Sequence, residues 1–189
     1  MRLLSVVALA GLLTTSPAIA QDQDAVASME RKLDHMETNG ALPQPDTTPT
    51  DFTEPEINSY LAAGKVELPT GVRSVAFHGE PGVITGTASI DFDQVRAGRS
   101  SMNPLLSVFS GIHRIVVVAH AQGGGREAIV HVDSVDLDGV EIPRFVLQSF
   151  VEKFLRPKYP KIGLDSRFSL PEKIDTATVG QQKLSVTQK

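Results

Sequence analysis

The sequence contains no cysteine and no tryptophan, and it has only two tyrosines and eight phenylalanines. Without cysteine the chain has no disulfide, no thiolate metal ligand, no thiol nucleophile and no cysteine for lipoprotein-type acylation. The scarcity of aromatic residues also leaves out the stacking platforms that hold single-stranded nucleic acids. We therefore expect a protein that is stabilised by an aliphatic core alone.

Long apolar runs are lacking as well, except at the start of the chain. Arg2 precedes an apolar run over residues 3–13, and Ala18, Ile19 and Ala20 form the small-x-small pattern of a cleavage site. This run is shorter than the ~20 residues that cross a bilayer, so a signal peptide is favoured over a membrane anchor. We predict that residues 1–20 are a secretory signal peptide and that the mature chain is periplasmic or secreted.

Basic charge is in deficit. The chain has 18 lysine and arginine residues against 22 aspartate and glutamate residues, a net charge of −4. Loss of Arg2 with the signal peptide would leave 17 against 22, or −5. General nucleic-acid binding needs a basic surface, so we expect no nucleic-acid partner.

Composition divides the rest of the chain into two parts. Residues 21–51 combine an amphipathic helix, predicted over residues 21–39, with a linker rich in proline and threonine. Residues 52–189 are predicted to form a single domain. The apolar stripe of the helix is narrow, so the sequence leaves open whether the helix docks on the domain.

Local signals in the domain are clearest around its first helix and in its strands. Thr53 and Glu56 have the spacing of a capping box, which predicts a short helix that starts there. Strand patterns follow over residues 72–78, 83–92, 115–121, 128–137, 168–170, 174–179 and 183–187. The apolar positions change parity between Val132 and Val135, which predicts a β-bulge near Asp133 and Ser134.

Residues 143–156 carry the strongest helical pattern. Pro143 suits the first turn of a helix and Pro157 ends it. Six apolar residues between them fit one broad helix face, namely Val146, Leu147, Phe150, Val151, Phe154 and Leu155. The predicted fold class is α+β, with a curved antiparallel β-sheet wrapped around this long C-terminal helix and a short N-terminal helix.

The small residues Gly86 and Ala88 interrupt the apolar face of the strand over residues 83–92. They either admit a closely packed helix or leave a groove, and ordinary packing favours the helix. If a groove exists, its predicted lining is Ile84, Ala88, Ile90, Leu147, Phe150, Val151 and Phe154.

Catalytic motifs are missing. The sequence has no Gly-x-Ser-x-Gly elbow and no His-Glu-x-x-His, and its triglycine at residues 123–125 lacks the Gly-Lys-Ser/Thr of a phosphate loop. We predict no enzymatic activity and no cofactor. A metal site of His120, His131 and Asp133 is a disfavoured alternative, because a turn centred on Gly124 would place His120 opposite Ala128.

Basic residues gather at the end of the predicted long helix, at Lys153, Arg156, Lys158 and Lys161. The simpler interpretation is that they interact with the helix dipole and with water. The functional interpretation is contact with anionic head groups, either on a bound lipid or at a membrane surface, by Lys153, Arg156 and Lys158.

Four stretches give the chain a resemblance to known bacterial proteins. They are Phe-Thr-Glu-Pro-Glu-Ile-Asn-Ser-Tyr-Leu at 52–61, Leu-Pro-x-Gly-Val at 68–72, Gly-Thr-Ala-Ser-Ile-Asp-Phe-Asp at 86–93 and Gly-Val-x-Ile at 139–142. Over residues 52–186 the chain resembles an uncharacterised family of secreted proteins and, more distantly, envelope lipoproteins with a tubular lipid-binding (TULIP-like) fold. The resemblance implies a highly curved sheet around a long helix, with a groove suited to acyl chains. It does not extend to the acylated cysteine of the lipoproteins.

Two functions therefore stand as expectations. We predict an exported, non-catalytic protein that binds a lipid or other hydrophobic small molecule in an apolar groove between sheet and long helix. The alternative is a structural or protein-interaction module of the cell envelope, with a filled core and no ligand. A cavity of several hundred Å³ would favour the first, and a solid core would favour the second.

Overall fold

The computed structural model describes residues 17–97, 110–157 and 160–189, without the side chains of residues 17–20, 96, 154 and 155. Most of the predicted signal peptide and all of Lys158 lie outside the described residues. Within them, no helix combines the length and the apolar character that a membrane span requires.

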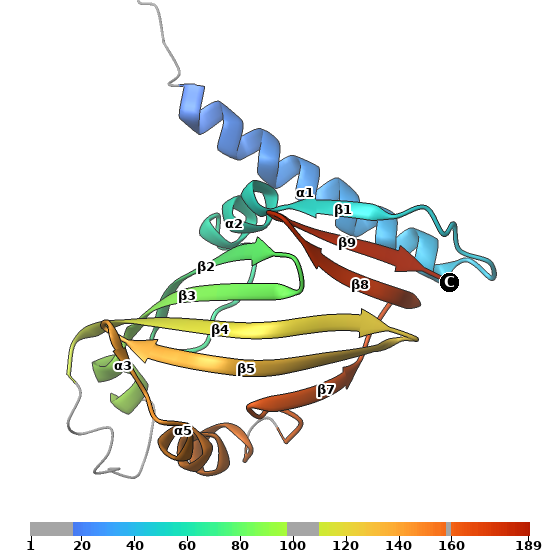
Figure 1. The fold of residues 1–189 in the computed structure, drawn as a ribbon. Helices are drawn as coiled ribbons and strands as arrows, with labels where there is room; N and C mark the ends of the chain where they lie inside the picture. The colour runs from blue at the N-terminus through green and yellow to red at the C-terminus, as the bar shows by residue number, and fades with distance from the viewer. Residues whose placement is uncertain (1–16, 98–109, 158–159) are drawn as a thin grey trace, which may run out of the picture.

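The nine described strands form one antiparallel sheet, which splays into two parts (Figure 1). The larger part contains β2 (Val72–Glu80), β3 (Val83–Asp91), β4 (Ile112–Gly124), β5 (Glu127–Leu137), β6 (Val140–Glu141) and β7 (Asp165–Ser169). The smaller part contains β1 (Thr50–Thr53), β8 (Ile174–Gly180) and β9 (Lys183–Gln188). The parts join where Gln122 and Gly123 of β4 pair with Thr178 and Ala177 of β8.

Helices lie around the margins of the sheet. They are α1 (Pro17–Ala41), α2 (Glu54–Ala62), α3 (Phe92–Ala97), α5 (Arg144–Phe150) and a π-helical turn, η1 (Val151–Leu155). The predicted capping box is confirmed, because Thr53 Oγ1 accepts from the Glu56 N–H and the Glu56 carboxylate accepts from the Thr53 N–H. The side chain of Asn58 on α2 bonds both the N–H and the carbonyl of Phe77, which protects the edge of β2.

One face of the larger part is apolar from β2 to β5. Cross-strand partners share a face, and the register pairs Ala88 with Ile115 and Ile115 with Leu137. The predicted bulge is confirmed, because Val118 pairs with Ser134 whereas Ala119 pairs with Val132, so that Asp133 is the additional residue. The bulge keeps the apolar residues on both sides of Asp133 on the same face of the sheet.

A cluster of buried apolar residues lies in the smaller part of the sheet, against α1. Met36 of α1 is buried against Phe52, Ile174 and Val186, which come from β1, β8 and β9. Below the apolar contact, the buried Asn39 side chain donates to Gln188 Oε1 at 2.8 Å. The N-terminal helix therefore docks on the sheet, a point that the sequence leaves open.

Polar contacts hold α1 against α2 as well. The Lys32 ammonium lies 2.6 Å from the Glu56 carboxylate, which also accepts from the Ser28 hydroxyl at 2.5 Å. Burial acts to raise the pKa of Glu56, but the hydrogen bonds from Lys32, Ser28 and Thr53 outweigh it and lower the pKa to about 2. The residue that caps α2 thus also anchors α1.

The predicted arrangement around a long C-terminal helix is wrong. Residues 144–150 form only two turns of α-helix, and η1 follows, where the Arg156 N–H bonds the Val151 carbonyl at 2.9 Å. The wider π turn departs from the period of 3.6 residues on which the prediction of one continuous apolar helix face depends. Instead of lying inside a curved sheet, α5 lies beside β5 at one end of the molecule (Figure 1).

Candidate functional site: an apolar cavity

A cavity of about 770 Å³ separates α5 from the apolar face of the sheet. The sheet contributes residues of β4 and β5 to its lining, namely Ile115, Val117, Val132, Val135 and Leu137. The opposite wall comes from α5, η1 and the chain that returns to the sheet, namely Val146, Leu147, Phe150, Val151, Ile162 and Leu164. The lining is therefore largely apolar on both sides.

The backbone around α5 explains why the cavity exists. We call residues 140–164 the α5 segment. The Ile142 N–H donates to the Val135 carbonyl at 2.8 Å where the segment leaves β5, and the Val132 N–H donates to the Leu164 carbonyl at 2.7 Å where it returns. Both ends are thus fixed to β5, and the helix between them spans the apolar face without filling the space beneath it.

The predicted groove residues separate into three groups. Leu147, Phe150 and Val151 line the cavity, and Val151 is buried. Ile84, Ala88 and Ile90 lie on the same face of the sheet but on β3, next to the cavity wall, and they are half-buried. Phe154 belongs to η1, and its side chain is outside the described ones.

Sequence reasoning missed the main sheet wall. The sequence pattern predicts strands that contain Ile115, Val117, Val135 and Leu137. It does not indicate which strands α5 covers. The change of parity around Asp133 was the available signal, because it places Val132 and Val135 on one face. Extending that parity to Ile115 and Val117 requires the observed register, because the register predicted from a turn at Gly124 would have placed Val116 opposite Val132.

A histidine–aspartate pair lies at one end of the cavity. His113 Nδ1 is 2.5 Å from Asp138 Oδ2, and its Nε2 is 3.0 Å from the Ser110 carbonyl oxygen. The hydrogen bond with Asp138 raises the pKa of His113 and lowers the pKa of Asp138. Both ring nitrogens face acceptors, an arrangement that suits the protonated imidazolium.

The predicted head-group residues do not line the cavity. Lys153 of η1 and Arg156, which follows it, are both exposed. Lys158 is outside the described residues. Contact with anionic head groups by these side chains would take place at the surface of the α5 segment, outside the cavity.

His120 and His131 face each other directly across the β4–β5 hairpin, so the register predicted from a turn at Gly124 is wrong. The turn lies at Gly125 and Arg126, both with positive φ (61° and 66°), which matches a two-residue hairpin turn. His120 Nδ1 is 2.7 Å from Asp133 Oδ2, and His131 Nδ1 bonds Asp165. Nevertheless, no three histidine or carboxylate groups of the described chain are arranged to hold a metal ion.

A second hollow of about 660 Å³ lies between α1 and α2. Its lining mixes small apolar residues with polar ones such as Asp22, Glu30 and Asn58. It lacks the continuous aliphatic wall of the cavity under α5, which is therefore the stronger candidate site.

Comparisons with protein-family models, with curated proteins and with solved structures find no significant match to this chain. The resemblance to secreted and TULIP-like proteins therefore stays a prediction.

Proposed function

We propose that this protein binds a lipid or another hydrophobic molecule, with the apolar part of the ligand in the cavity between β4, β5 and α5. The observation that carries the proposal is the cavity itself. Its volume of about 770 Å³ lies within the range of about 300–1,000 Å³ that is typical of small-molecule sites. An apolar occupant would gain dispersion contacts with the apolar walls on both sides of this space and would be stabilised there.

The size of the expected stabilisation can be bounded. Each buried methylene contributes about 0.8 kcal/mol, so a chain of about ten methylenes contributes about 8 kcal/mol before the cost of immobilising it. Taken alone, this gross value would correspond to a dissociation constant of about 1 μM, and the cost of immobilisation makes the net affinity weaker. We therefore expect a ligand with a long hydrocarbon part, because a short one would bind too weakly.

The polar groups at the cavity favour binding over catalysis. A general base must offer a ring nitrogen to the reacting group, but both nitrogens of His113 already face acceptors. Asp138 in turn accepts from the Arg114 N–H at 2.8 Å, so the pair connects β4 with the turn after β5. We assign His113 and Asp138 a structural role at the cavity end.

Native mass spectrometry of the chain purified without detergent, followed by lipid extraction, tests the proposal. We expect a co-purifying apolar molecule, or uptake of a phospholipid or fatty acid that is offered. Phe150→Asp should abolish this adduct, because it places a charge in the apolar wall.

Phe145→Asp is the matched control, because Phe145 lies on the same helix, is 75% exposed and does not line the cavity. It should retain the ligand. A protein that stays without an adduct when lipids are offered would refute the proposal and favour the structural or protein-interaction module.

A further inference from the structure

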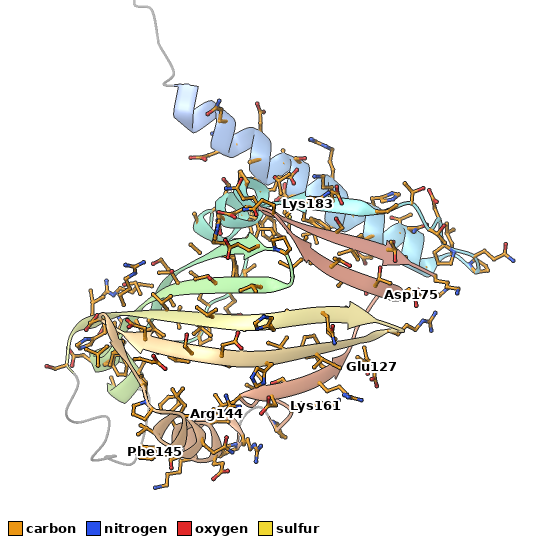
Figure 2. All side chains as sticks on the ribbon, viewed as in Figure 1. Glu127, Arg144, Phe145, Lys161, Asp175 and Lys183 are labelled. Carbon is orange, nitrogen blue, oxygen red and sulfur yellow. The ribbon has the colours of Figure 1, made fainter. Side chains whose placement is uncertain are left out.

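The α5 segment exposes large apolar side chains beside the cavity. Phe145 is 75% exposed, Val140 is 69% exposed and Ile162 is 46% exposed. Figure 2 shows Phe145 on α5, at the end of the molecule opposite α1. Phe145 and Val140 have the two largest exposed fractions among the large apolar side chains of the described part of the chain, and strong apolar exposure is a sign of an interaction surface.

The same segment is basic in an otherwise acidic chain. Residues 140–164 contain five lysine and arginine residues and two glutamates, a net charge of +3. The rest of the sequence has 13 basic and 20 acidic residues, a net charge of −7. Lys153, Arg156 and Lys161 are exposed. The net positive charge therefore lies on the segment that exposes apolar side chains, whereas the rest of the chain has a net negative charge.

One basic residue of the segment is already engaged. Arg144 donates to the Val132 carbonyl at 3.0 Å and to Asp165 at 3.1 Å, which ties the start of α5 to β5 and β7. This anchoring fixes the position of the neighbouring Phe145. The segment therefore presents its exposed apolar residues from a backbone that is held to the sheet.

We propose that the α5 segment docks on the surface of an anionic lipid bilayer. Phe145 and Val140 would enter the interfacial layer, while Lys153, Arg156 and Lys161 contact the head groups. Exposed aromatic and aliphatic residues together with lysine and arginine are the combination found in interfacial segments. Each basic residue close to such a surface contributes about fivefold in affinity.

The orientation has a consequence for the cavity. Val140, Val146 and Ile162 line the cavity and are also exposed, so the cavity reaches the surface through the docking segment. A docked protein would therefore open its cavity toward the layer that holds apolar ligands. This inference goes beyond ligand binding, because docking can be measured on a protein whose cavity is empty.

Tryptophan fluorescence gives a direct test, because the natural chain has no tryptophan. Phe145→Trp places a single reporter on the segment, and Leu42→Trp places one on another exposed residue, just after α1. Both full-length variants are mixed with phosphatidylcholine vesicles, with or without about one third phosphatidylglycerol. With anionic vesicles, but not with neutral ones, we expect the emission of Phe145→Trp to shift to the blue and to be quenched by brominated lipid. Both changes should reverse at about 0.5 M salt, where charges are screened.

Vesicle flotation supplies the affinity. Phe145→Asp should reduce binding to anionic vesicles at least tenfold, whereas Leu42→Asp should leave it unchanged. No association with anionic vesicles would overturn docking, and so would equal, salt-independent association with neutral ones. Self-association through Phe145 without vesicle binding would also overturn it. Failure of docking would leave ligand binding intact, since the mass spectrometric test uses no vesicles.

Discussion

The two parts of the sheet are built differently. In the packed part, formed by α1, α2, β1, β8 and β9, Met36 and Phe52 are buried with Ile174 and Val186. In the cavity part, formed by β2 to β7 and α5, almost all residues of β3 are half-buried. An apolar cavity lies between the sheet and α5 in this part. The comparison teaches that the packed part holds a cluster of mutually buried side chains, whereas the cavity part keeps half-buried apolar surface around a space that suits a ligand.

The largest effect should come from a truncation in the packed part. Phe52→Ala removes a buried ring next to Met36 and should cost about 3–5 kcal/mol of unfolding free energy. Val135→Ala on the cavity wall only enlarges an existing space, so it should cost about 1 kcal/mol. Chemical denaturation measures both. Equal losses would show that the two parts are packed alike.

The junction between the two parts should be the next most sensitive place. A Cβ on Gly123 would lie 2.9 Å from the Cβ of Ala177, closer than packing allows. Gly123→Val should therefore cost about 1–3 kcal/mol by forcing β4 away from β8. Gly124→Val is the control, because a Cβ there meets nothing within 4 Å. If thermal unfolding shows Gly124→Val to be less stable than Gly123→Val, the close contact between β4 and β8 at Gly123 would be contradicted.

Acid should weaken the contact between α1 and α2 in the packed part. The pKa of Glu56 is lowered from 4.5 to about 2. The contribution of its carboxylate to the stability of the fold is therefore complete above pH 4.5 and is lost as the pH falls through about 2. Glu56→Gln preserves the capping-box geometry, since Gln also serves there, but it removes the charge opposite Lys32. We expect a loss of about 1–3 kcal/mol at pH 7 and a flatter acid dependence. Glu30→Gln, which changes an exposed partner of Lys65, should leave the acid dependence as it is.

The smallest effect concerns the cavity end. The hydrogen bond with Asp138 raises the pKa of His113. The contribution of this bond to the stability of the fold is therefore complete below the pKa of the unfolded chain, and it is lost as the pH rises through the pKa of the folded one. NMR titration of the imidazole should show a raised pKa that falls in Asp138→Asn. If the pKa of His113 stays unchanged in Asp138→Asn, Asp138 is not the cause of the raised pKa.

Local features of this fold could be predicted from the sequence. The capping box of Thr53 and Glu56 depends only on residues three apart, and the bulge at Asp133 follows from the parity of one strand. Leu147, Phe150 and Val151 could be assigned to the site because one helical stripe contains them. In each case the determining interactions lie within a single element.

Features that depend on distant elements could not be predicted. The apolar stripe of residues 146–155 fits a regular helix, but the observed π turn divides it, and α5 covers β4 and β5 instead of β3. The pairing of His120 with His131 depends on a turn at Gly125 and Arg126, and positive φ at an arginine is not indicated by its residue type. Register and helix placement thus need the tertiary structure.

A cavity-filling pair tests the central claim most directly. Val117 lines the cavity, whereas its neighbour Val116 points to the opposite face of β4. Titration of both variants with the fluorescent apolar probe N-phenyl-1-naphthylamine compares the two faces. We expect Val117→Phe to weaken binding at least tenfold, and Val116→Phe to bind like the natural chain. Equal binding by the two variants, or no binding by the natural chain, would contradict an apolar ligand site under α5.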